Sequence, residues 1–305
     1  MELSIVTTLY RSSEYIGDFY KRIKIIAEKL TDEFEVIFVN DGSPDNSLDI
    51  ALSLRTTDDR IKVIDLARNF GHHKAIMTGL SFAKGKYVFL IDVDLEEPPE
   101  LLELFWMKME DEIDVDVFYG VQEQRKGNII EILTGSFFYK IYNYLSNDKI
   151  ENNPIMCRLM KLEYVKALIS YQEKEIFLAG LFTITGYNQK AITVKKFSTS
   201  PTTYSFKKKL ALMVNAITAF SNKPLEFIFN IGLMISLLSF GFVVYIILKQ
   251  LIFGISMQGW TTIIASIWLM GGIIIFCIGI VGIYISKIFI EVKNRPNTTI
   301  KKYYK

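Results

Sequence analysis

The chain has 305 residues, half of them hydrophobic, and a formal net charge of +2 at pH 7. This balance hides a division, because residues 1–206 carry 24 basic and 31 acidic side chains whereas residues 207–305 carry 11 basic and 2 acidic ones. The basic half predicts a membrane or another polyanion as its partner. Two cysteines that lie far apart in the chain exclude a disulfide-stapled framework.

Strands and helices alternate through the first half of the chain. The predicted strands are Leu3–Leu9, Phe34–Val39, Ile61–Asp65, Tyr87–Ile91 and Val115–Tyr119, and the predicted helices are Ile16–Leu30, Ser47–Leu54 and His72–Phe82. Such alternation predicts an α/β fold with a parallel sheet that helices cover on both faces. Residues 1–206 are long enough to form one globular domain with its own core.

Two polar loops lie where such a sheet binds ligands, beyond the carboxyl ends of its strands. Asp41 directly follows a buried strand, and Gly42 permits the tight turn after it. Asp41 therefore either binds the base or the ribose hydroxyls of a nucleotide, or it only stabilises the turn. Arg68-Asn-Phe-Gly71 offers a cation and a flexible backbone at a helix start, where anions bind. The adjacent His72 and His73 are interpreted as surface and packing residues.

Two carboxylates, Asp92 and Asp94, follow the apolar strand Tyr87–Ile91. Because that strand is apolar on both faces, it is predicted to lie at the centre of the covered sheet. Residues i and i+2 of an extended segment point the same way, and paired carboxylates suit a hard divalent cation that also holds substrate phosphates. The alternative is a pair of solvated aspartates before a helix that Pro98 and Pro99 open.

Two apolar stretches dominate the second half. Phe227–Leu248 and Gln250–Ser286 contain no charged residue, and about 20 apolar residues suffice for a helix to cross a bilayer. Spans are therefore predicted near 227–249 and 262–286, within a transmembrane hairpin over 227–286.

The flanking charges predict the topology of this hairpin. A basic juxtamembrane segment over 207–226 precedes it, and a basic tail over 287–305 follows it. By the positive-inside rule, both chain termini and the domain over 1–206 are expected to lie in the cytoplasm. The first residues of the chain begin a strand and lack the layout of a signal peptide.

Five stretches follow one another along the chain in a characteristic order: Val39-Asn-Asp-Gly-Ser43, Ala67-Arg-Asn-Phe-Gly-His72, Asp92-Val-Asp-Leu-Glu-Glu-Pro98, Ser136-Phe-Phe-Tyr139 followed by Tyr144-Leu-Ser146, and Cys157-Arg-Leu-Met160. Together with two terminal spans, they resemble the family 2 glycosyltransferases of the GT-A fold. The closer likeness is to the polyprenyl-phosphate branch, which includes dolichol-phosphate mannose synthase and the bactoprenol glucosyltransferases. The likeness covers nearly the whole chain, and the combination of motifs is specific although no single motif is.

The resemblance implies a fold and a set of donor-binding residues. The fold would be a Rossmann-like nucleotide-diphospho-sugar transferase with a mostly parallel sheet, followed by juxtamembrane helices and two transmembrane helices. The nucleotide would be bound by Thr8, Asp41, Arg68 and Asp92. Asp94 and Glu96 would bind Mg²⁺ or Mn²⁺ across the diphosphate.

The resemblance also implies catalytic and acceptor-binding residues. Catalysis would depend on Asp92, Asp94 and Arg125, whose cation would meet the donor or acceptor phosphate. Ser136 and Tyr139 would face the phosphate and first isoprene units of the acceptor lipid, and Arg125 and Arg158 are the candidate anchors of that phosphate.

The chain departs from the family pattern at two positions. Relatives usually read Gly-Asp-Phe-Arg where this sequence reads Ile155-Met-Cys-Arg158, so Met156 stands in place of an aspartate usually regarded as catalytic. Ala179 stands where a cation is common. A thioether cannot accept a proton or bind a hard metal ion, so an acceptor that needs a base is disfavoured.

The leading interpretation is an inverting, metal-dependent glycosyltransferase of the bacterial inner membrane. It would move a sugar from a nucleotide sugar to undecaprenyl phosphate for the synthesis or modification of surface polysaccharide such as O-antigen. The expected partners are the nucleotide sugar, the polyprenyl phosphate, the membrane and further copies of the chain, but no nucleic acid. One alternative is a transferase that elongates a lipid-linked oligosaccharide at a sugar hydroxyl, and another is a non-enzymatic membrane partner with a degenerate fold.

Overall fold

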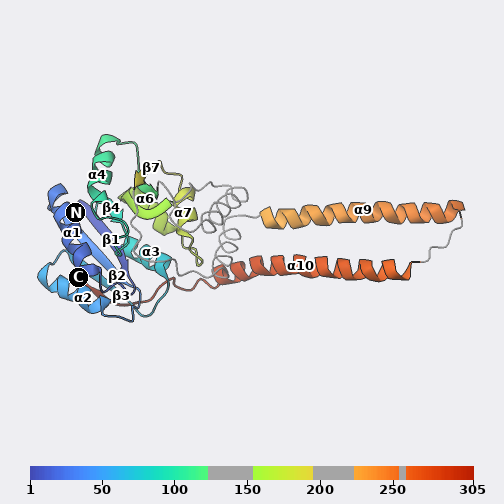
Figure 1. Ribbon diagram of the computed structural model, residues 1–305, viewed down its shortest axis with the longest axis horizontal. Helices are drawn as coiled ribbons and strands as arrows, with labels where there is room; N and C mark the ends of the chain where they lie inside the picture. Colours follow the sequence, from blue (N-terminus) through green and yellow to red (C-terminus); the bar gives the residue numbers. More distant parts are fainter. Residues whose placement is uncertain (123–153, 195–222, 254–258) are drawn as a thin grey trace.

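The computed structural model describes residues 1–122, 154–194, 223–253 and 259–305. A globular α/β part contains both chain termini, and two long helices project from it side by side (Figure 1). The sequence predicted both features, one from the alternation of strands and helices and the other from the two apolar stretches.

In the described residues, eight strands form one sheet in the order β7-β5-β6-β4-β1-β2-β3-β8. Their bounds are β1 Leu3–Leu9, β2 Phe34–Asn40, β3 Ile61–Leu66, β4 Tyr87–Leu90, β5 Val117–Gln122, β6 Pro154–Lys161, β7 Gln189–Val194 and β8 Ile300–Tyr304. Strands β1 to β4 are mutually parallel, which confirms the predicted parallel sheet at its centre. The sheet as a whole is mixed, because β6 runs antiparallel to β4 and β5, and β8 runs antiparallel to β3.

Helices cover both faces of this sheet, as the sequence predicts. Their bounds are α1 Ile16–Leu30, α2 Ser47–Thr57, α3 His72–Phe82, α4 Leu101–Asp111, α6 Leu162–Ser170, α7 Leu178–Ile184, α9 Lys223–Phe253 and α10 Trp260–Val292. Buried side chains of α1, α2 and α4 belong to one hydrophobic cluster, and those of α3, α6 and α7 belong to another. The two clusters lie on opposite faces of the sheet because successive residues of a strand alternate between faces.

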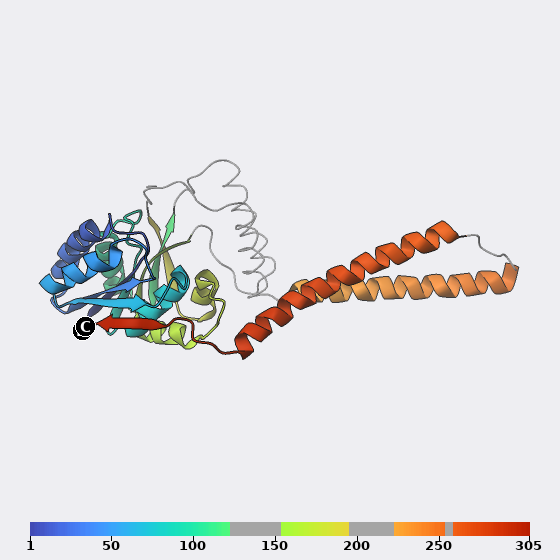
Figure 2. The ribbon, with the colours of Figure 1, turned by 90° about the horizontal axis from the view of Figure 1, so that it is seen from below.

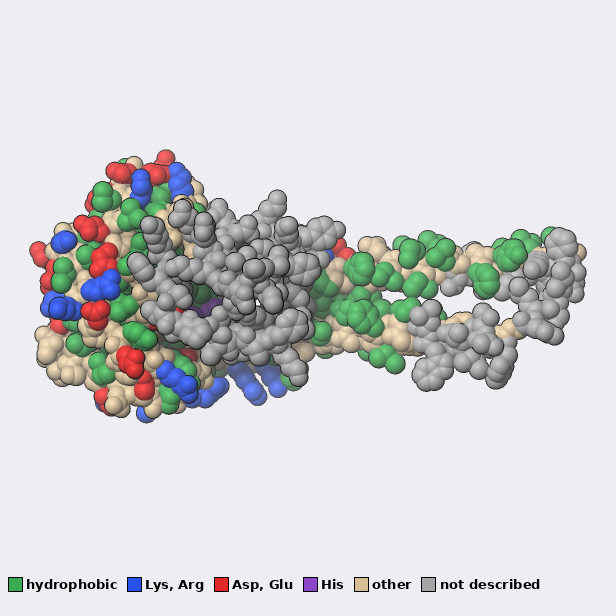
Figure 3. Space-filling model, viewed as in Figure 1, with side chains coloured by type: hydrophobic (Ala, Val, Ile, Leu, Met, Phe, Trp, Pro, Cys, Tyr) green, Lys and Arg blue, Asp and Glu red, His purple; other side chains and the backbone are tan. Residues whose placement is uncertain are grey.

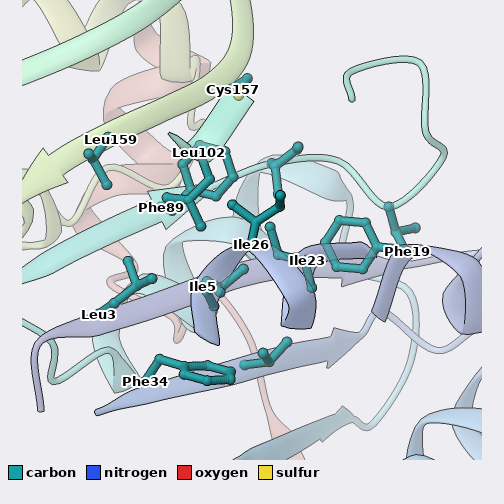
Figure 4. Packing of buried hydrophobic residues seen from close by; sticks show 14 of the residues in the cluster. Leu3, Ile5, Phe19, Ile23, Ile26, Phe34, Phe89, Leu102, Cys157 and Leu159 are labelled. Atoms are coloured by element: carbon teal, nitrogen blue, oxygen red, sulfur yellow. The ribbon is translucent and has the colours of Figure 1, made fainter. Parts of the chain in front are cut away.

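Strand β1 shows how the two clusters arise. Leu3 and Ile5 belong to the cluster that includes Phe34 and Phe19, and Figure 4 shows members of this cluster from close by. Val6 belongs to the cluster on the opposite face. All seven residues of β1 are buried, as expected of a central strand that is covered on both sides. This rigid centre carries the polar residues that follow the ends of the strands.

The last residues of the chain return to the globular part and add strand β8 to the edge of the sheet (Figure 2). β8 pairs with β3, and the Ala67 N–H donates to the Thr299 carbonyl at 2.9 Å. The rings of Tyr303 and Phe82 meet edge to face at 4.8 Å. The sequence analysis assigned 287–305 to a basic tail and did not predict this strand.

Where their side chains are described, helices α9 and α10 expose many apolar residues, whereas charges of both signs lie on the globular part (Figure 3). Among the described residues, Met270–Val292 of α10 is the segment long and apolar enough to cross a membrane by composition and length. The second predicted span falls in α9, where the description of the residues is incomplete, and it stays a prediction. α10 also continues past the predicted end at 286, to Val292.

Candidate functional site

The parallel strands bring the predicted nucleotide-binding residues to one edge of the sheet. β1 lies between β2 and β4 and runs parallel to both, with Thr8 opposite Val39. Thr8 is next to the last residue of β1, and Asp41 and Asp92 follow the ends of β2 and β4. All three residues therefore lie at the carboxyl edge, where open α/β sheets bind ligands.

Asp41 holds the loop before α3 in place. Its side chain is buried, and its two carboxylate oxygens accept hydrogen bonds from the N–H groups of Phe70 (2.7 Å) and Gly71 (3.0 Å). Gly42 makes this close approach feasible, because a Cβ atom at Gly42 would lie 2.5 Å from backbone atoms of Arg68–Asn69. Asp41 thus shapes the site, and its contact with a nucleoside stays a prediction.

A second carboxylate joins the loops that follow β1 and β2. Asp45 accepts hydrogen bonds from the hydroxyls of Ser43 (2.5 Å) and Ser47 (2.6 Å) and from the Ser13 N–H (3.1 Å). Burial alone would raise the pKa of Asp45, but these hydrogen bonds to its charged form outweigh burial and hold the pKa below its ordinary value. Asp45 is therefore ionised at neutral pH and fixes the two loops against each other.

Asp92 and Asp94 emerge together from the end of β4. Both are half-buried, and Val93 between them packs into the core, as the predicted i, i+2 arrangement requires. The chain then turns sharply, because Leu95 has a φ of 60° and the Glu96 N–H donates to Asp94 Oδ1 at 3.0 Å. A non-glycine residue in this region costs on the order of 1–3 kcal/mol, and such strain gathers at functional sites.

The side chains at this edge limit the kind of metal site that could form there. Glu96, the second predicted metal ligand, is half-buried next to the turn that Asp94 makes. In the described ranges, no group of three or more His, Cys, Asp or Glu side chains is arranged to hold a metal ion. Asp94 and Glu96 offer carboxylate oxygens, the donor type that suits Mg²⁺, Ca²⁺ and Mn²⁺.

His72 lies between two of the predicted site residues. Its Nδ1 lies 3.0 Å from Thr8 Oγ1, and its Nε2 lies 3.4 Å from Asp92 Oδ1. The sequence analysis placed His72 among surface and packing residues, yet the first position of a helix at the ligand edge was a signal for a site residue. His73 is different: its Nδ1 contacts the Ile176 carbonyl at 3.1 Å, and burial lowers the pKa of its ring.

Arg68 lies on the exposed side of the loop before α3. Its Nη1 donates to the Asn69 carbonyl at 2.9 Å, and its guanidinium carbon lies 4.1 Å from the centre of the Phe70 ring. These contacts hold the cation over the loop that Asp41 anchors. The structure thus brings Thr8, Asp41 and Arg68 to the same end of the sheet as Asp92.

A pocket of about 320 Å³ opens next to this edge. Its lining residues come from β5, β6, α7, β7 and the segment between the last two: Tyr119, Pro154, Ile155, Met156, Arg158, Ala179, Phe182, Thr183, Tyr187 and Gln189. Leu90 of β4 pairs with Arg158 of β6, so Asp92 and Met156 both lie beyond the same end of this strand pair. The two positions that depart from the family pattern, Met156 and Ala179, therefore line one pocket beside Asp92.

Arg158 carries the positive charge in the wall of this pocket. Its side chain is buried, with the guanidinium carbon 3.2 Å from the centre of the Phe182 ring. Nε donates to the Met156 carbonyl (3.2 Å) and Nη2 to the Ile155 carbonyl (3.4 Å). Burial lowers the pKa of Arg158 to about 10, so the group stays charged at neutral pH.

Arg125, Ser136 and Tyr139 lie outside the described residues. Their contacts with phosphate and lipid therefore stay predictions.

Comparisons with known proteins place these features in a family. Residues 4–169 match the profile of the family described as Glycosyl transferase family 2. The whole chain is 46% identical to a putative glycosyltransferase of Mycobacterium tuberculosis and spans 89% of it. It is also 32% identical to a prophage-derived bactoprenol glucosyl transferase of Shigella flexneri, with 100% of this chain and 99% of that one aligned.

A solved structure shows the same fold. A mannosyltransferase from Pyrobaculum calidifontis, in complex with GDP-Man and Mn²⁺, has a TM-score of 0.50 and 14% identity over 72% of this chain and 63% of that one. Together with the family match, this likeness supports the GT-A-like α/β fold that the sequence predicts.

Proposed function

The chain belongs to glycosyl transferase family 2, and from that premise we propose that it transfers a sugar from a nucleotide sugar to the phosphate of a polyprenyl lipid in a membrane. Relatives named bactoprenol glucosyl transferase, 31–32% identical over nearly the whole chain, support this acceptor. The observation that carries the proposal is the convergence of Thr8, Asp41 and Asp92 at one edge of the sheet, beside a pocket that contains a buried arginine.

The donor is proposed to lie along the carboxyl edge. The nucleoside lies against Thr8 and Asp41, and the ribose lies near Asp92. The diphosphate lies toward the start of α3, because the N–H groups and dipole of a helix N-terminus attract anions. Arg68, at the loop before this helix, adds a positive charge on the same side.

The residues at the edge fit Mg²⁺ or Mn²⁺. Asp92, Asp94 and Glu96 supply hard carboxylate oxygens, and Mg²⁺ in such enzymes is usually held by one or two carboxylates together with substrate phosphates. This fits an edge that lacks a cage of three or more ligands among the described residues. A bound ion would help to neutralise the charge that develops on the leaving diphosphate.

The pocket beside Asp92 is proposed to hold the acceptor. Arg158 supplies a positive charge for a phosphate, and Met156 and Ile155 supply an apolar wall for the first isoprene unit. Of the lining residues, none carries a carboxylate that could serve as a base. A phosphate monoester has its second pKa at about 6 and is mostly dianionic near pH 7, so it needs positioning more than proton removal.

The transfer reaction follows from this arrangement. A phosphate oxygen of the acceptor forms a bond to the anomeric carbon of the sugar while the bond from that carbon to the donor's diphosphate oxygen breaks. The electron pair departs with the nucleoside diphosphate, the configuration at the carbon inverts, and no proton is transferred. Arg158 and Arg125 hold the acceptor phosphate, and charge neutralisation on the leaving group is expected to supply most of the catalysis.

The membrane arrangement is supported by β8. Because β8 pairs with β3, the globular part and the strand that follows α10 lie together, on one side of any membrane that the two helices cross. By the positive-inside rule, we propose that the catalytic domain and both termini lie in the cytoplasm. The chain would then cross the inner membrane twice, and its product would serve surface polysaccharide synthesis or modification.

A panel of radiolabelled nucleotide sugars, incubated with membranes that contain the protein, tests the proposal. The expected result is label in the lipid extract that depends on added undecaprenyl phosphate and disappears in the Asp94→Asn variant. Label that appears only on a lipid that already carries a sugar would instead support elongation at a sugar hydroxyl. No transfer from any donor would support a non-enzymatic membrane partner.

A further inference from the structure

Thr8, His72 and Asp92 form a row of contacts across the carboxyl edge of the sheet. Thr8 Oγ1 lies 3.0 Å from His72 Nδ1, and His72 Nε2 lies 3.4 Å from Asp92 Oδ1. The three residues come from the end of β1, the start of α3 and the segment after β4. The imidazole of His72 therefore bridges the ends of two neighbouring strands.

The two contacts favour one tautomer of the His72 ring. A neutral imidazole has one N–H donor and one acceptor nitrogen, whereas a carboxylate oxygen can only accept. We expect the proton on Nε2, which lies 3.4 Å from Asp92 Oδ1, so that Nδ1 can accept a hydrogen bond from the Thr8 hydroxyl, 3.0 Å away.

The backbone of His72 is held from the other side of the site. Asp41 accepts hydrogen bonds from the N–H groups of Phe70 and Gly71, the two residues that precede His72. Gly71 has a φ of 101°, a conformation that glycine adopts without strain. The segment 70–72 thus connects Asp41, which is proposed to face the nucleoside, with Asp92, which is proposed to lie near the ribose.

We propose that His72 is a positioning residue of the sugar transfer, which orients Asp92 so that its second oxygen, Oδ2, is left to bind the donor or the metal. This inference rests on the proposed function. The His72 side chain is 43% exposed, so it is accessible from the site and is not a core residue. Partners that orient a binding carboxylate or imidazole typically change affinity or activity by about 10–100-fold.

His73 supplies a matched control on the same helix turn. Its ring is half-buried and contacts the Ile176 carbonyl, in the segment before α7. His73→Asn keeps a donor near the position of Nδ1, so it preserves that contact while it removes the second imidazole. It should leave nucleotide binding unchanged.

The tautomer of His72 can be measured without any ligand. The chain has two histidines, so ¹⁵N-histidine labelling of the full chain in detergent gives signals from two rings, and the His73→Asn variant leaves His72 alone. At about pH 9, above the range in which histidines usually titrate, we expect the proton on Nε2 and a shift of the Nδ1 signal in Thr8→Val. An Nδ1-protonated ring, or signals averaged between both tautomers, would overturn the proposal.

Binding and turnover provide the second measurement. Mn²⁺ is titrated in the presence of UDP and of GDP, and turnover is measured with the sugar donor that the wild type uses. We expect His72→Ala and His72→Asn to weaken Mn²⁺ binding about 10–100-fold. His72→Gln should retain most of the binding, because the amide nitrogen of Gln is placed like Nε2 of His.

The outcomes separate this inference from the proposed function. If the wild type binds Mn²⁺ with a nucleotide and His72→Ala binds it equally well, with His72→Gln no different, His72 has no positioning role and the inference is wrong. If the wild type binds neither nucleotide and transfers sugar from no donor of the panel, the proposed function is wrong, and the tautomer measurement alone decides whether His72 orients Asp92. Thermal unfolding of each variant confirms that the fold is retained.

Discussion

The carboxylates at the carboxyl edge differ in what they contact. Asp41 is buried and bonds to backbone N–H groups, whereas Asp92 and Asp94 are half-buried at a sharp turn. Because an unsatisfied buried donor costs about 1–3 kcal/mol, replacement of Asp41 is expected to reduce stability as well as binding. Replacement of Asp94 should affect chemistry more than folding.

Asp94→Asn is expected to reduce sugar transfer by about 100-fold or more while the melting temperature stays close to that of the wild type. Loss of one preorganised electrostatic contact in an active site typically has an effect of this size. Transfer to lipid and thermal unfolding are measured on the same preparation, and Asp111→Asn, at the exposed end of α4, serves as the control. Wild-type activity in Asp94→Asn, or full wild-type activity in excess EDTA, would remove the metal site from the proposal.

Gly42→Ala should destabilise the protein by about 1–3 kcal/mol. The residue has a φ of 57°, and the added Cβ would lie 2.5 Å from the Arg68–Asn69 backbone, so the loop that Asp41 holds must move. Gly17→Ala, in α1, adds a Cβ with nothing within 4 Å and should stabilise the helix by about 0.5–1 kcal/mol. Equal unfolding midpoints for the two variants in denaturant would contradict the close approach at Gly42.

Turnover on a lipid phosphate should rise through about pH 6 and then level off, because the dianion of the acceptor is the nucleophile. Met156→Ala should keep this profile and cost little beyond packing, since Met156 supplies no proton acceptor. The rate is measured against pH with saturating donor. A profile that rises near pH 7–8 in the wild type and changes in Met156→Ala would show that this region tunes an enzyme base instead.

At the scale of elements, the C-terminal end of α10 contacts the segment between α6 and α7. Lys287 pairs with Glu175 at 2.5 Å, and the Lys174 N–H donates to Glu291 at 2.7 Å. The carbonyl of Ile176, in the same segment, contacts His73 of α3. These contacts connect the C-terminal end of α10 with α3, the helix that opens the candidate site.

Charge reversal tests this connection. Lys287→Glu places two carboxylates together and should lower both stability, by about 1–3 kcal/mol, and lipid glycosylation. The double variant Glu175→Lys/Lys287→Glu restores an opposite-charge pair and should recover most of both. Thermal unfolding and transfer are compared across the four proteins of the cycle. Additive losses in the double variant would mean that the pair does not couple the helix to the site.

Several elements could be predicted from the sequence because their patterns are local. The bounds of β1, α1 and α3 match the predicted ranges, since apolar residues recur there with the period of a strand or a helix. Asp41 and Asp92 were placed at one edge because both directly follow buried strands. Those signals do not depend on distant parts of the chain.

Other features could not be predicted in this way. The sequence Ile300-Lys-Lys-Tyr-Tyr304 is short and polar, and it becomes β8 only because β3, far away in the chain, offers a free edge. The antiparallel insertion of β6 between β4 and β5 likewise depends on long-range pairing. His72 acquires its contacts from the ends of β1 and β4, which no local pattern specifies.

At the scale of the whole molecule, one sheet joins the beginning and the end of the chain. In the chain, β8 follows α9 and α10, and it pairs with β3 at the edge of the sheet. The globular part therefore contains residues that precede the two long helices in the sequence and residues that follow them. Through β8, the sheet also holds the segment that follows α10. In the proposed function, this arrangement keeps the acceptor pocket at a fixed height above the lipid that it glycosylates.

The most direct test of the account is the identity of the acceptor atom. Purified protein in detergent is incubated with undecaprenyl phosphate and the sugar donor that membranes use, and the lipid product is analysed by ³¹P NMR and mass spectrometry. The account predicts that the phosphate monoester becomes a diester that carries one sugar, with release of one nucleoside diphosphate. An unchanged lipid phosphate, together with sugar added to a hydroxyl of a lipid-linked saccharide, would contradict it.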